Sequence, residues 1–276
     1  MSGPRIPIVS CLTAVSVLAG LLAVSGCAGS TTSDGEAGQD DATAIELVLE
    51  AERTMHRAGG IAEFWLPTEV HMEVKDEAPQ DPAEFEPMLR EAIGQLKQAL
   101  ELDPGLHRAR FDIAVIHMRL LEPEPAEAWA KGFLKEKPND PQGLELLSTI
   151  YIATEKWREL AELSEAAIPV LEAGEEEADY VLDPCYFRSL AAIAHFKLGE
   201  LDEARKWAEA RIEADDEDPQ GYCILGVIQH VTGDTEGLAE TRAILRKLDP
   251  DAEPMLDRII ENLEEQGLEA LLPVTP

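Results

Sequence analysis

Apolar residues recur at intervals of three and four along most of the chain after residue 41, a spacing that places them on one face of a helix. Within 107–120, the residues that share such a face are Phe111, Ala114, Val115 and Met118. A proline-containing break at 122–125 follows, and the next helix is expected to end at Lys137, because Pro138 cannot continue it. The pattern therefore predicts an all-α chain whose helices come in pairs.

Further pairs are expected toward the C-terminus, with Gly199 and Gly233 in the turns between their helices. Their predicted ranges are 185–198 with 202–214, and 219–232 with 235–248. Asp-Pro dipeptides are expected to start new pairs, because aspartate caps a helix N-terminus and proline suits its first turn. These dipeptides stand at 103–104, 140–141, 218–219 and 249–250.

The two ends of the helical region depart from this regularity. Residues 42–106 predict an irregular first pair, with helices at 42–58 and 83–102 separated by the long insert 59–82. The insert contains Phe64, Trp65 and Leu66, and is interpreted either as a flap that closes the first repeat or as a loop that contacts a partner. At the other end, 251–276 predicts an amphipathic capping helix, over 254–266, and a tail.

The pairs repeat with a period of 34 residues. Ala92 aligns with Ala126 and Pro104 with Pro138; further on, Gly199 aligns with Gly233. The two registers are offset by about ten residues, which fit an insertion near 173–183, because insertions between repeats usually form surface loops.

This pattern resembles the tetratricopeptide repeat (TPR) family over roughly residues 84–250, most strongly over 185–250. The residues that carry the resemblance are Leu225-Gly226, Gly199, Gly233, Ala92, Ala126, Ala204, Pro104, Pro138 and Pro250. The bulky first-helix aromatic of the family is replaced by Arg110, Leu144 and Arg188, and is kept at Tyr222. The resemblance implies an α-solenoid of about five helix pairs plus the C-terminal capping helix, with TPR-like repeats over 107–250. Other helical repeats are the alternative.

The N-terminus has the pattern of a secretion signal. Arg5 precedes an uncharged, largely apolar run, which ends in Val24-Ser25-Gly26-Cys27. That tetrapeptide resembles the lipobox of bacterial lipoproteins, which implies a signal peptide over 1–26 and lipidation of Cys27. An ordinary cleaved signal and a retained transmembrane anchor are the alternatives.

Residues 27–41 would then form the lipidated cysteine and a flexible tether. The residues after the cysteine, Ala28 and Gly29, replace the aspartate that often marks inner-membrane retention in lipoprotein families. The resemblance therefore favours a cell-envelope protein on the outer membrane, facing the periplasm, if the host has two membranes.

The charge balance is strongly acidic, with 23 Lys and Arg against 55 Asp and Glu and a net charge of −32. A nucleic-acid partner is excluded, because it would require a basic surface. The acidity could steer a basic partner or simply keep the protein soluble. Aromatic residues make up 5% of the chain, so the core is expected to be mainly Ala and Leu.

No catalytic or phosphate-binding motif occurs in the sequence, and no histidine has metal-ligand spacing with another His or Cys. His117 and His195 occupy equivalent repeat positions and are interpreted as packing residues. Cys185 and Cys223 could form a disulfide in an oxidising compartment or serve as small packing residues. We therefore predict no enzymatic activity, metal, cofactor or small-molecule substrate.

In TPR proteins the first helix of each pair lines a groove. Carried onto this chain, the resemblance gives as groove candidates Arg108, Phe111, Val115, Met118, Arg119, Ile152, Tyr186, Ile193, Phe196, Lys197, Cys223, Val227 and His230. Their character suggests a partner segment with apolar anchors and some acidic groups. The alternative is that half of them are ordinary inter-repeat packing.

Three functions are compatible with the sequence. The first is a membrane-anchored adaptor or scaffold that binds proteins in the bacterial cell envelope, for example as an assembly factor. The second is a structural subunit of a periplasmic or outer-membrane complex, and the third is an unrecognised enzyme or ligand carrier.

Overall fold

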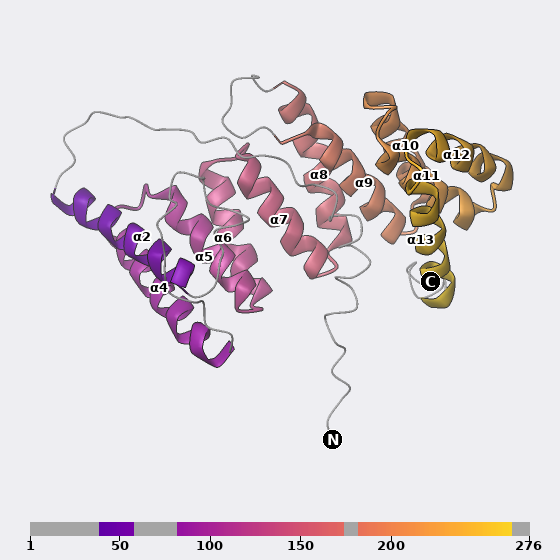
Figure 1. Ribbon diagram of the computed structural model, residues 1–276. Coiled ribbons are helices and arrows are strands. Elements are labelled where there is room, and N and C mark those ends of the chain that lie inside the picture. Colours follow the sequence, from indigo (N-terminus) through magenta and orange to yellow (C-terminus); the bar gives the residue numbers. More distant parts are fainter. Residues whose placement is uncertain (1–38, 58–81, 174–181, 267–276) are drawn as a thin grey trace. The chain divides into compact units, whose positions relative to one another are not determined.

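The computed structural model describes residues 39–57, 82–173 and 182–266, and every regular element in these ranges is an α-helix (Figure 1). In chain order the helices are α2 (Gln39–Arg57), α4 (Pro82–Leu102), α5 (His107–Arg119), α6 (Pro123–Glu136), α7 (Pro141–Ala153), α8 (Trp157–Glu172), α9 (Pro184–Lys197), α10 (Leu201–Ala214), α11 (Pro219–Thr232), α12 (Thr235–Leu248) and α13 (Ala252–Gln266). The all-α prediction is confirmed, and α11 and α12 have the predicted bounds.

The turns within four successive helix pairs share one backbone conformation. Their residues with positive φ are Leu121, Glu155, Gly199 and Gly233, spaced by 34, 44 and 34 residues. In each turn the next residue donates its amide to a carbonyl five residues back at 2.9 Å; the pairs are Glu122 to His117, Lys156 to Tyr151, Glu200 to His195 and Asp234 to Gln229. This hydrogen bond ends a helix with a left-handed residue. The backbone therefore repeats in the two registers that the sequence predicts.

Aspartates cap the first helices of the later pairs. Asp218 accepts a hydrogen bond from the amide of Gln220 at 2.7 Å, directly before Pro219 opens α11. Asp183 caps α9 in the same way, at an Asp-Pro dipeptide that is not among the four predicted starts. The dipeptides at 103–104 and 249–250 differ from the prediction, because α5 and α13 begin two or three residues later and the dipeptides lie in the preceding turns.

The chain divides into two compact units, and the division falls within α7, between Ile150 and Tyr151. In the N-terminal unit, α2 packs against α4, α4 against α5, and α5 against α6. The rings of Phe111 and Phe133 meet edge to face in its core, with centroids 5.5 Å apart. Small residues such as Ala92 and Ala126 are fully buried, so the helices approach closely.

The C-terminal unit contains the end of α7 and helices α8–α13. Ala204 and Ala208 of α10 pack with Ile224 and Ile228 of α11 in one apolar cluster. A second cluster joins α11 and α12 to α13 through residues such as Leu256. A Cβ atom on Gly226 would lie 2.7 Å from Leu256, so the absence of a side chain lets α13 pack against α11. Helix α13 thus covers the last pair as a cap.

The predictions for the signal peptide, the tether, the insert 59–82 and the tail concern residues largely outside the described ranges, as does most of the predicted insertion at 173–183. Where these predictions reach described residues, two bounds are wrong: residues 39–41, predicted as tether, begin α2, and Pro82, predicted as the end of the insert, begins α4. Within the described ranges, none of the helices has both the length and the apolar composition needed to span a membrane.

Candidate protein-binding surfaces

The predicted groove residues divide into a buried and a half-buried set. The side chains of Phe111, Val115, Phe196 and Cys223 are buried in the core, where a partner would not reach them. The half-buried set comprises Arg108, Met118, Arg119, Ile152, Tyr186, Ile193, Lys197, Val227 and His230. We call this second set the first-helix surface, meaning the half-buried first-helix side chains of each unit taken by itself, and its role in binding stays a prediction. Cys27, Phe64, Trp65 and Leu66 lie outside the described residues.

Two basic side chains of the first-helix surface, Arg119 and Lys197, lie over aromatic rings. The Arg119 guanidinium lies 5.8 Å from the centre of the Phe85 ring, and Lys197 Nζ lies 5.7 Å from that of Trp157. Burial lowers the pKa of Arg119. Such stacking orders a long cationic side chain while part of it stays exposed.

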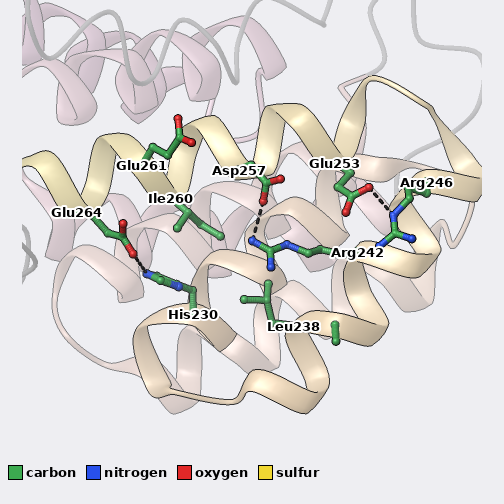
Figure 2. A pocket seen from close by; sticks show the side chains of 10 residues that line it. His230, Leu238, Arg242, Arg246, Glu253, Asp257, Ile260, Glu261 and Glu264 are labelled. Atoms are coloured by element: carbon green, nitrogen blue, oxygen red, sulfur yellow. Dashed lines mark hydrogen bonds and ion pairs between the residues drawn. The ribbon is translucent and has the colours of Figure 1, made fainter.

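A surface hollow of about 680 Å³ lies among α11, α12 and α13 (Figure 2). Its apolar lining consists of Leu238 and Ala239 of α12 and Ile260 of α13; Leu238 and Ile260 are buried, and Ala239 is exposed. His230 is the one member of the first-helix surface that lines it. The hollow therefore combines an apolar base with a charged border.

Ion pairs join that border to the capping helix. Arg242 donates to Asp257 at 2.6 Å, and Arg246 donates to Glu253. His230 Nε2 lies 3.3 Å from Glu264, and Figure 2 shows these side chains pointing toward one another. These two ion pairs and the His230–Glu264 contact reach from α11 and α12 to α13, so they bridge the last helix pair to the cap and line the hollow. Sequence reasoning missed Arg242 and Arg246, because a pairing between two helices leaves no local spacing signal.

The two histidines that were interpreted as packing residues are buried, and each also belongs to a polar network. His117 Nδ1 lies 2.7 Å from Glu122, and His195 Nδ1 lies 2.6 Å from Glu200. Each glutamate also binds an arginine of the preceding second helix; these arginines are Arg90 and Arg158. The hydrogen bonds from the arginines, with smaller contributions from the histidines, lower the pKa of both glutamates. The repeated network links successive pairs and is structural.

A buried charge cluster occurs in the N-terminal unit. Arg108 Nε lies 2.9 Å from Asp112 Oδ1 and 4.0 Å from Glu52 Oε1 of α2. Burial raises the pKa of Asp112 to about 7; Arg108 opposes this shift and Glu52 adds to it. Burial likewise raises the pKa of Glu52, against the effect of Arg108. Arg108 is therefore already engaged by two carboxylates.

Cys185 and Cys223 are buried free thiols. Burial raises the pKa of Cys223 to about 12 and also raises that of Cys185, which keeps both in the unreactive thiol form. Among the described residues, no group of three or more His, Cys, Asp or Glu side chains could hold a metal ion.

The fold is a TPR-like all-α solenoid. This assignment is supported by its similarity to solved structures. One match is YrrB, described as a TPR protein with an unusual peptide-binding site; its TM-score is 0.50 and its identity 16%, over 66% of this chain and 86% of that chain. Another is MamA, from residue 41 to its end, from Desulfovibrio magneticus RS-1, with a TM-score of 0.54 and 13% identity over 76% of this chain and 96% of that chain. No protein-family model and no curated protein matches the sequence.

Proposed function

We propose that this protein is a non-enzymatic scaffold that binds protein partners through the first-helix surface of its repeats. The observation that carries this proposal is the TPR-like packing of helix pairs within each unit, which leaves half-buried apolar and basic side chains on the first helices of both units. Stacked helix pairs commonly use such surfaces to bind partners. YrrB, which has a similar fold, is described as having a peptide-binding site, and this supports the same type of role here.

The chemistry of the surface suggests what the partner segment carries. Ile193 and Val227 offer apolar contacts on α9 and α11, and Lys197 offers a cation held on Trp157. The hollow at α11–α13 can take an apolar side chain over Leu238 and Ile260. A segment with apolar anchors and acidic groups beside them would fit these features.

A pair of charge reversals tests the role of the basic members. We expect Arg119→Glu combined with Lys197→Glu to abolish capture of partners from cells that express the tagged full chain. The control combines Lys131→Glu with Lys206→Glu, which changes the net charge equally at exposed lysines of second helices. Partner capture that survives the first combination, or is lost equally in both, would refute the proposal.

The location of the scaffold is a further part of the proposal. The lipobox-like Val24-Ser25-Gly26-Cys27 supports attachment to a bacterial membrane through lipidated Cys27, with the outer membrane favoured in a host with two membranes. In the cell envelope, a tethered scaffold of this kind could serve as an assembly factor.

Fractionation of cells tests the anchor separately from binding. Cys27→Ser is expected to move the protein from the membrane to the soluble fraction. Cys11→Ser, in the apolar run before the lipobox, is the matched control and is expected to leave the protein on the membrane. A Cys27→Ser protein that still sediments with membranes would rule out lipidation as the tether.

A further inference from the structure

Three charged side chains of the N-terminal unit meet where α2 approaches α5. Glu52 comes from α2, whereas Arg108 and Asp112 lie one helical turn apart on α5. Arg108 Nη1 also donates to Gln142 of α7 at 3.4 Å. A single guanidinium is thus shared by two carboxylates and an amide from three helices.

The cluster contains two carboxylates but one cation, and its carboxylates are largely buried from solvent. The side chain of Asp112 is 2% exposed, and its Oδ2 atom is buried and accepts no hydrogen bond. The side chain of Glu52 is 16% exposed. The charged groups that act on Asp112 are Arg108 and Glu52. Helices α4 and α6 also pack on α5, but their described residues contribute no further charged group to Asp112. An ionised Asp112 therefore leaves a buried negative charge only partly compensated.

We propose that Glu52, Arg108 and Asp112 form a proton-linked contact that controls how firmly α2 is held in the N-terminal unit. When Asp112 takes up one proton, Glu52 and Arg108 remain as a balanced ion pair. When Asp112 loses that proton, two negative charges surround one guanidinium, and states in which α2 separates and water reaches Asp112 become more populated.

The direction of the pH effect follows from the raised pKa of Asp112. An exposed aspartate has a pKa of about 4, whereas burial holds the pKa of Asp112 at about 7. A carboxyl with a raised pKa stabilises the folded contact fully below about pH 4, and that stabilisation is lost as the pH rises through about 7. The pKa of Glu52 is also raised by burial, so its ionisation weakens the contact in the same direction as the pH rises. Helix α2 should therefore be held more firmly in mild acid than in mild base.

Hydrogen exchange of the full chain measures this contact directly. The probe is the protection of α2 amides at about pH 5.5 and about pH 8, after correction for intrinsic exchange, with α12 amides of the other unit as an internal reference. In the unmodified protein, α2 protection relative to α12 is expected to fall about tenfold or more between these pH values. In Asp112→Asn this fall should disappear, whereas Glu101→Gln, at an exposed acid of α4, should retain it.

Glu52→Gln supplies a second variant if Asp112→Asn does not fold, and it should reduce the fall because it removes the repulsion on Asp112. Protection of α2 that does not change with pH in the unmodified protein would overturn the proposal. A pH-dependent fall that persists unchanged in the Asp112→Asn or Glu52→Gln variants would overturn it as well.

Discussion

The two units bury charge in different ways. In the C-terminal unit, Arg211 is 4% exposed; its guanidinium donates to Ser189 at 3.1 Å and to Asp218, so one cation faces one carboxylate. In the N-terminal unit, Asp112 and Glu52 share the single cation Arg108. The buried cluster of the C-terminal unit thus pairs one cation with one carboxylate, whereas that of the N-terminal unit has one carboxylate more than it has cations.

The largest effect should come from breaking the balanced cluster. Arg211→Met is expected to lower the free energy of unfolding of the C-terminal unit by about 3 kcal/mol, because Ser189 and Asp218 lose their buried donor. Urea denaturation followed by circular dichroism provides the measurement. A loss below about 1 kcal/mol would show that the hydrogen bonds from Arg211 to Ser189 and Asp218 contribute little to stability.

The cluster of Glu52, Arg108 and Asp112 should instead make the free energy of unfolding depend on pH. Between about pH 5.5 and about pH 8, the unmodified protein should lose about 2 kcal/mol more stability than Asp112→Asn, since the pKa of Asp112 is raised to about 7 when folded and the stabilisation disappears above that value. Urea midpoints of both proteins at the two pH values test this. Parallel pH profiles would contradict it.

In the C-terminal unit, α13 can pack closely against α11 because Gly226 has no side chain. Gly132 of α6, in the N-terminal unit, has no such close neighbour. Gly226→Val should cost about 2 kcal/mol and expose α13 to hydrogen exchange, because its side chain would collide with fully buried Leu256. Gly132→Ala meets nothing within 4 Å and should stabilise α6 by up to about 1 kcal/mol. If Gly226→Val left α13 protected, the packing described for the cap would be wrong.

Substitutions in the repeat turns should have the smallest effects on stability, and Gly233→Ala and Leu121→Gly should act in opposite directions. Gly233→Ala is expected to cost about 1 kcal/mol, because alanine tolerates the left-handed conformation poorly. Leu121→Gly relieves the same strain, and because Leu121 is 74% exposed it loses little packing, so a gain of up to about 1 kcal/mol is expected. Thermal unfolding of both variants measures the difference; equal signs would show that turn strain is not the controlling factor.

The sequence predicted the repeat framework well, because local signals define it. Apolar spacing, the glycines of the turns and the Asp-Pro dipeptides each act within a few residues, and the structure repeats its turns in the predicted registers. Even Leu121 follows the register, although leucine gives no turn signal there.

The surfaces could not be predicted equally well, because burial depends on neighbouring helices. Phe111 and Phe196 were predicted to line the groove, but both side chains are buried in the core. The hollow beside α13 and the sharing of Arg108 by Glu52 and Asp112 arise from residues far apart in the sequence. Spacing along a single helix carries no information about such pairings.

Site-specific photo-cross-linking tests the central claim, that the first-helix surface binds a protein partner, most directly. A photoreactive residue at Ile193 or Val227 of the full chain should form the same cross-linked product in living cells. The same residue at Glu162 or Glu209, exposed positions on second helices, should form none. Cross-links from Glu162 or Glu209 with none from Ile193 and Val227 would contradict the account.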